Sequence, residues 1–278
     1  MKRLLLAIIF LLSISIISHS KVTLPPIFAD NMVLQQQTDA AIWGKATPDT
    51  KVVITNTWSK DKVVVRSDAD GKWFARLSTP VAGGPYNITV SDGEKLTLKN
   101  VLIGEVWICA GQSNMEMPMK GFLGQPVTGS EYMILGAKPS VPIRMCTVHR
   151  NVALEPQEEC ETVWYEHTPE GVAESSATAY YFSKMLYETL DIPVGFICVS
   201  YGGSTIQAWM DPEILRTEFA DDFDFSHLDE KFIPENRPHR APGLLYNGML
   251  STVVPFTAKG FLWYQGCSNS DIHQTYKR

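Results

Sequence analysis

A short apolar run that stops at a glycine constrains the fold of this chain more than any other feature. Residues 106–110 are apolar, as in a buried parallel strand, and Gly111 permits the tight turn that follows. The turn leaves Ser113 exposed where a helix would begin. A serine in this position is a candidate nucleophile, although serine is also a common helix cap. The stretch therefore predicts a strand, a sharp turn and a helix, with Ser113 at the tip.

Two later stretches have the same design. One apolar run leads to Gly203, and another leads to Gln265 and Asn269. Because ligands of open α/β sheets bind beyond the carboxyl ends of the strands, we expect the three tips to converge on one crevice. Acyl transfer needs a nucleophile and donors for the developing oxyanion. These tips carry Ser113, the backbone N–H of Gly203 and two side-chain amides.

The three tips also carry recognisable blocks of sequence. They read GQSNM at 111–115, GGSTIQAW at 202–209 and WYQGCSN at 263–269. Two further blocks are DNMVLQ at 30–35, near the start of the chain, and YNGML at 246–250, before the last apolar run. Together these blocks closely resemble the sialate O-acetylesterase family of the SGNH hydrolases, over nearly the whole chain after residue 20. One departure is Cys267, where the family usually has glutamate, and the role of that carboxylate is therefore open.

The resemblance implies a fold and an activity. The fold is a three-layer, flavodoxin-like α/β domain of the SGNH type, and the activity is removal of O-acetyl groups from a sugar, most plausibly sialic acid. Ser113 would attack the acetyl carbonyl, while Gly203, Gln265 and, with less support, Asn269 would hold the oxyanion. An acetylxylan esterase is the alternative enzyme. An inert carbohydrate-binding fragment is the alternative of another class.

The histidine that a serine nucleophile needs is missing from its expected place. The family carries it in an Asp-x-x-His block near the end of the catalytic domain, and no such block follows Asn269. Asp271 and His273 have the wrong spacing. The earlier loop histidines are expected to be solvated; they are His149, His167, His227 and His239. We therefore expect an α/β domain that is incomplete at its C-terminus, and a chain that is inactive by itself.

Residues 21–101 show a different pattern. Apolar and polar residues alternate there, and Asp70-Gly71 and Asp92-Gly93 are typical hairpin turns. This predicts a small antiparallel β-sandwich domain ahead of the α/β domain at 102–278. Trp58 is a candidate for sugar binding, and a purely structural module is the alternative.

Helices and strands alternate in the second part of the chain. A helix is expected after the Ser175-Ser176 cap, ending near Leu190 and with Met185 on its apolar face. Another helix is expected over 244–254, followed by a strand at 259–264. This alternation is typical of a sheet covered by helices.

The first 20 residues have the composition of a secretory signal. Lys2 and Arg3 precede an apolar stretch from Leu4 to Ile17, which at fourteen residues is shorter than the about 20 that span a bilayer. A retained anchor is the alternative. We expect an exported protein, periplasmic or extracellular, with no stable membrane insertion once the signal is removed.

Composition limits the partners. A net charge of -6 and the absence of a long basic run argue against nucleic acid. No His/Cys/Asp cluster has the spacing of metal ligands, so neither a metal nor a cofactor is expected. Five cysteines leave at least one thiol unpaired; Cys146 and Cys160 are a candidate pair, and Cys267 is the candidate reactive thiol.

Overall fold

The computed structural model describes residues 21–277, and the predicted signal segment at 1–20 lies outside the described residues. The strands are β1 (Val33–Gln35), β2 (Asp39–Lys45), β3 (Lys51–Asn56), β4 (Lys62–Arg66), β5 (Lys72–Ser78), β6 (Gly83–Ser91), β7 (Lys95–Gly111), β8 (Ile143–Val148), β9 (Thr162–Tyr165), β10 (Val194–Ser200) and β11 (Gly260–Tyr264). The α-helices are α2 (Ser113–Glu116), α3 (Ser130–Leu135), α4 (Pro169–Glu174), α5 (Ala177–Leu190), α6 (Pro212–Glu218), α7 (Ser226–Asp229) and α8 (Leu244–Gly248). Short 3-10 helices are η1 (Ile206–Trp209), η2 (Pro238–Arg240), η3 (Leu250–Thr252) and η4 (Cys267–Lys277).

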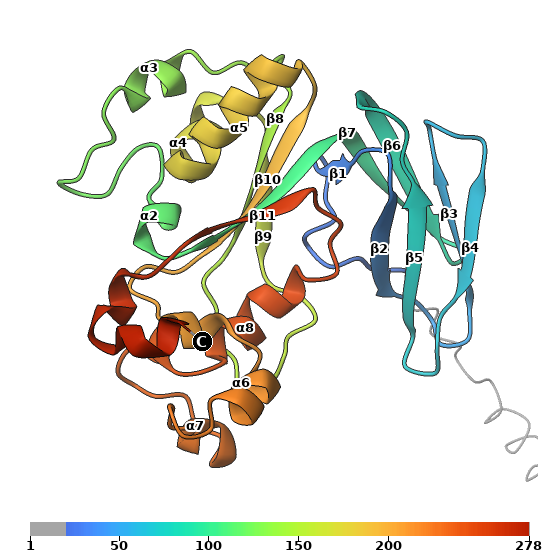
Figure 1. The fold of residues 1–278 in the computed structure, drawn as a ribbon. Helices are drawn as coiled ribbons and strands as arrows, with labels where there is room; N and C mark the ends of the chain where they lie inside the picture. Colours follow the sequence, from blue (N-terminus) through green and yellow to red (C-terminus); the bar gives the residue numbers. More distant parts are fainter. Residues whose placement is uncertain (1–20, 278) are drawn as a thin grey trace, which may run out of the picture.

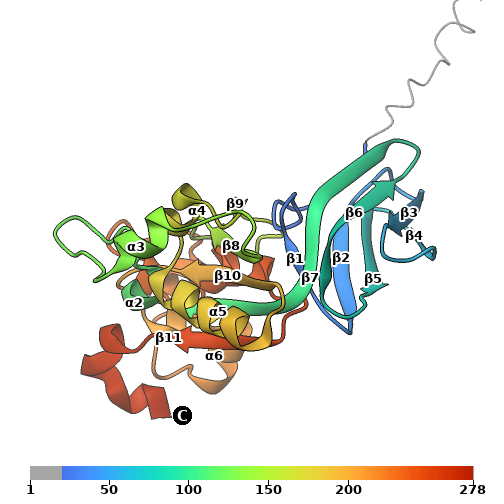
Figure 2. The ribbon, with the colours of Figure 1, turned by 90° about the horizontal axis from the view of Figure 1, so that it is seen from above.

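The long strand β7 connects the two parts of the molecule (Figures 1 and 2). Its first half pairs antiparallel with β6, and its second half pairs in parallel with β10 and β11. The boundary predicted between residues 101 and 102 therefore falls inside one continuous strand. Since this strand is hydrogen-bonded on both sides of that point, the two parts are joined by sheet structure rather than by a linker.

The first part of the chain is built from antiparallel strands, apart from β1, which pairs in parallel with β7. Among the described strands, β2 pairs with β5 alone, and this pair shares one hydrophobic core with β3, β6 and β7. The Asp92-Gly93 hairpin is confirmed, because β6 and β7 are neighbours. The Asp70-Gly71 hairpin is wrong: β4 pairs with β3, whereas β5 crosses to β2. The crossing buries the alternate side chains Trp73, Ala75 and Leu77 of β5 in the core.

The second part is an α/β structure, as predicted. Strands β7, β10 and β8 are parallel neighbours, β9 adds an antiparallel edge, and β11 lies on the other side of β7. Helix α5 packs against β10 and β8, and α6 and α8 lie on the opposite side of the sheet (Figure 1). A mixed sheet covered by helices results, and its parallel strands all end near α2.

The two helix predictions had different outcomes. Helix α5 is confirmed, and the Ser176 hydroxyl caps it by accepting from the N–H of Ala179 at 3.2 Å. Its buried face differs in part from the prediction, because Met185 is 68% exposed while Tyr180 is buried. The helix expected over 244–254 is divided into α8 and η3 by non-helical backbone at Met249.

The described cysteines form no disulfide. All five are free thiols, so the candidate pair of Cys146 and Cys160 is not bonded. Burial raises the pKa of the Cys146 thiol well above its usual value, so this thiol stays protonated at neutral pH. Cys267 is exposed. Over residues 21–277, none of the helices combines the length and the apolar character that a membrane crossing requires.

Candidate active site

Ser113 occupies the first position of α2, directly after β7. Gly111 makes this possible: its φ is +149°, and a Cβ there would lie 2.1 Å from the carbonyl oxygen of Tyr264. The preceding Gln112 is buried, and its Oε1 accepts from the N–H of Gly266 at 3.0 Å. Among the side chains that the structure describes, the Ser113 hydroxyl has no hydrogen-bond partner. The first tip therefore presents a free hydroxyl on a fixed backbone.

The second tip lies beside the first. A Cβ built on Gly202 would lie 3.6 Å from the Cβ of Ser113, which places the two tips in contact distance. Gly203 has a φ of +75°, and its carbonyl accepts from Nε of Arg240 at 3.0 Å. The N–H of Gly203 donates to no group among the described residues. A free backbone donor thus lies next to the free hydroxyl.

The side-chain amides of the third tip are engaged inside the protein. Gln265 donates from Nε2 both to the carbonyl of Ser204 at 3.0 Å and to Oδ1 of Asn269 at 2.8 Å. Asn269 is buried, accepts from the N–H of Ile206 at 2.9 Å and donates to Oε1 of Gln207 at 3.0 Å. These bonds hold the chain at 204–207 against the third tip. The oxyanion role expected for the two amides stays a prediction.

An ion pair that the sequence analysis missed stands next to Ser113. Glu116 accepts from Nε of Arg150 at 2.6 Å and, through its other oxygen, from the N–H of Gly202 at 2.8 Å. The hydrogen bond to Glu116 raises the pKa of Arg150. Two signals in the sequence point to these residues: Glu116 directly follows the GQSNM block, and Arg150 follows the end of β8, whose carboxyl end meets those of β7 and β10.

His239 belongs to the same cluster. Its ring stacks on Tyr201 with the centroids 4.7 Å apart, and the guanidinium of Arg150 covers the same tyrosine at 4.6 Å. Burial lowers the pKa of His239, and Arg240, Arg150 and Arg237 lower it further. The imidazole is therefore neutral at neutral pH.

The expectation that the loop histidines are solvated is wrong for two of them. His167 is buried and its Nε2 lies 3.0 Å from the hydroxyl of Tyr180, while His227 is buried with its Nε2 2.9 Å from the carbonyl of Pro242. Both rings fill internal sites where a ring nitrogen is hydrogen-bonded. No histidine in the described residues is hydrogen-bonded to Ser113.

The described residues contain no cluster of three or more histidine, cysteine, aspartate or glutamate side chains that could hold a metal ion. The site is therefore composed of a serine hydroxyl, backbone donors, amides and an ion pair. These groups suit nucleophilic attack on a carbonyl. An α/β sheet with a serine at the first turn after a parallel strand, and with the free N–H of Gly203 beside it, is the arrangement expected of a serine hydrolase.

Comparison with known proteins identifies the family. The model of a family described as carbohydrate esterase, sialic acid-specific acetylesterase, matches residues 103–278, and the chain belongs to this family. The human sialate O-acetylesterase is 30% identical over 86% of this chain and 47% of its own length, and the mouse protein is 27% identical over 89% and 52%. The chain spans about half the length of these curated relatives.

A solved structure supports the same assignment. The crystal structure of a carbohydrate acetylesterase from Xanthomonas citri matches with a TM-score of 0.77 and 31% sequence identity. The match covers 89% of this chain and 52% of that one. The similarity therefore extends across both parts of the chain described above.

Proposed function

We propose that this protein is a carbohydrate O-acetylesterase of the SGNH type that removes O-acetyl groups from sialic acid. The observation that carries the proposal is the free hydroxyl of Ser113 beside the Gly202-Gly203 tip, whose Gly203 N–H is also free. Family membership and the names of the relatives support the same activity.

The proposed reaction begins with attack of Ser113 Oγ on the acetyl carbonyl. The N–H groups of Ser113 and Gly203 stabilise the oxyanion, with Gln265 and Asn269 as the further predicted donors. The sugar hydroxyl leaves as the acetyl-serine forms, and water then releases acetate. The family resemblance implies that a histidine of an Asp-x-x-His block takes the proton from Ser113.

Two arginines favour an acidic sugar over xylan. Arg150 and Arg240 are each held by a hydrogen bond from Nε, to Glu116 and to Gly203 respectively. Their terminal nitrogens have no hydrogen-bond or ion-pair partner among the described residues, and Nη2 of Arg150 lies 3.8 Å from the Cβ position built on Gly202, beside Ser113. Guanidinium groups oriented in this way suit the carboxylate of sialic acid.

The test uses a form of the protein that contains the Asp-x-x-His block, and it compares acetate release from O-acetylated N-acetylneuraminate with release from acetylated xylan. We expect the sialate to be the better substrate, and the Arg150→Met variant to lose about tenfold or more in kcat/KM on the sialate only, since a charge-assisted hydrogen bond is lost. Arg66→Met, a change on the exposed strand β4, is the matched control. Faster release from xylan would favour the alternative enzyme, and glycan retention without acetate release would favour the binding protein.

The remaining parts of the proposal concern organisation and location. We propose that residues 21–101 act as a β-sandwich module on the esterase domain, which is supported by the core that β2 and β5 share with β3 and β6. We also propose export after cleavage of a signal near residue 20, without membrane insertion and without a nucleic-acid partner. N-terminal sequencing of the secreted protein tests the cleavage; an intact Met1 would contradict it.

A further inference from the structure

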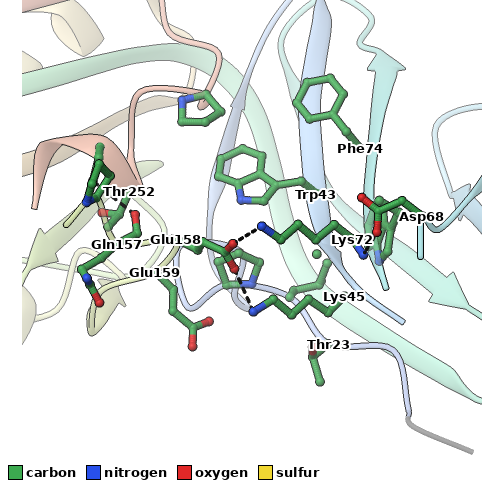
Figure 3. A pocket seen from close by; sticks show the side chains of 17 residues that line it. Thr23, Trp43, Lys45, Asp68, Lys72, Phe74, Gln157, Glu158, Glu159 and Thr252 are labelled. Carbon is green, nitrogen blue, oxygen red and sulfur yellow. Dashed lines mark hydrogen bonds and ion pairs between the residues drawn. The ribbon is translucent and has the colours of Figure 1, made fainter. Parts of the chain in front are cut away.

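A hollow lies away from Ser113, where the β2–β5 pair meets the α/β part (Figure 3). This seam pocket has a volume of about 510 Å³. Its walls come from residues 23–25, from strands β2 and β5, from the loop at 156–159 and from residues 251–255. None of the residues assigned to the esterase site lines it. The volume is in the range of small-ligand sites.

One wall of the seam pocket is aromatic. Trp43 of β2 and Phe74 of β5 are direct cross-strand partners, so their side chains lie on the same face of the sheet. Phe74 is 49% exposed, and Trp43 is partly buried because the ring of Phe28 packs edge-on against it at 4.5 Å. Two rings therefore line the pocket side by side.

The next cross-strand pair on this face consists of two lysines, Lys45 and Lys72. Like charges directly opposite each other destabilise a sheet unless a counter-charge lies between them. Glu158, from the loop of the α/β part, supplies that charge: one oxygen lies 2.8 Å from Nζ of Lys45 and the other is paired with Lys72 (Figure 3). The two lysines lower the pKa of Glu158 to about 2.

This bridge leaves polar groups that can bind a ligand. Each lysine ammonium has three donors, of which Glu158 uses one. Asp68 also lines the pocket, so the positive charges of Lys45 and Lys72 are offset by carboxylates. An anionic ligand is disfavoured, because the carboxylates of Glu158 and Asp68 would repel it. An apolar ligand is disfavoured as well, because it would leave the ammonium donors without partners.

The two sides of the seam are held together outside the pocket. The N–H of Ala41 donates to Oγ1 of Thr257 at 2.9 Å, and Phe28 stacks on Phe256 at 5.6 Å. Both contacts join the β2 region to the segment before β11. The pocket is therefore formed before a ligand arrives, which limits the entropy cost of binding.

We propose that the seam pocket binds an uncharged sugar ring and is a second carbohydrate site, separate from the esterase crevice. A sugar has apolar C–H faces that suit the rings of Trp43 and Phe74, and hydroxyl edges that suit the donors and acceptors of Lys45, Lys72 and Glu158. Such a site would hold a neighbouring residue of an acetylated glycan and raise the local concentration of the ester.

The test measures binding of two uncharged probes, N-acetyllactosamine and xylohexaose, to the full chain by saturation-transfer NMR and titration. We expect saturable binding of at least one probe, weakened about tenfold by Phe74→Ala, since this change removes both the stacking ring and the apolar area that it would bury against the sugar. Tyr132→Ala, an exposed aromatic on α3, is the matched control and should bind normally. Circular dichroism checks that each variant is folded.

Other results would overturn the proposal. They are the absence of saturable binding, equal binding by the Phe74→Ala variant, or a dimer that this change converts to monomer, which would assign the pocket to a second copy of the chain. Ser113→Ala should leave sugar binding at the seam unchanged. Failure of this site is therefore distinguishable from failure of the esterase assignment.

Discussion

Glu116 accepts a hydrogen bond from the backbone N–H of Gly202 at 2.8 Å and thereby fixes the second tip beside the first turn of α2. We predict that Glu116→Ala lowers stability by about 1.5–3 kcal/mol, because a hydrogen bond to a charged group is lost, and lowers kcat by about 10²-fold through misplacement of Gly203. Urea unfolding and acetate release measure the two effects. Glu116→Gln keeps an acceptor and should retain more of the stability and more of the kcat. Identical losses in the two variants would contradict the role of Glu116 in positioning the second tip.

The kinetics of a Gln265 variant distinguish two roles for this residue, as an oxyanion donor or as a substrate-binding residue. Its Nε2 donates to Ser204 and Asn269 in this structure. If it also serves as an oxyanion donor, Gln265→Ala should lower kcat by about 10²–10³ with little change in KM, and we predict this result. Steady-state kinetics on an O-acetylated sialate provide the measurement. A change confined to KM would make Gln265 a substrate-binding residue instead.

The stability of the protein should fall in mild acid. Burial lowers the pKa of His239 and His167 below their usual value of 6.5. The unfolded chain therefore binds protons at these sites more readily than the folded protein, so stability present above about pH 6.5 is lost as the pH falls toward the folded-state pKa values. Urea midpoints of the wild type and of His239→Gln across this range measure the effect. If the urea midpoint depends on pH equally in both proteins, His239 does not contribute to the loss of stability.

The parts of the fold that follow from local sequence were predictable. Apolar runs ended by a glycine located β7, β10 and β11, and the Ser176 cap located α5. The pairing of β5 with β2 was not predictable in this way, because both β4 and β2 carry apolar residues and the choice depends on contacts far apart in the sequence.

The site was predictable to a similar extent. Ser113 and Gly203 belong to strand tips, which short patterns locate. The hydrogen bonds from Gln265 to Ser204 and Asn269 depend on how two loops meet, and no local pattern contains that information. The stacking of Arg150, Tyr201 and His239 likewise joins three separate segments.

The most direct measurement of the central claim is to find the acetyl group on the enzyme. A form of the protein that contains the Asp-x-x-His block is mixed with O-acetylated N-acetylneuraminate, quenched in acid during turnover, digested and analysed by peptide mass spectrometry. If Ser113 is the nucleophile, the peptide that contains it carries an acetyl group, and Ser113→Ala abolishes both this adduct and acetate release without loss of folding. Acetate release that persists in Ser113→Ala, or an acetyl group on a different residue during turnover, would contradict the account.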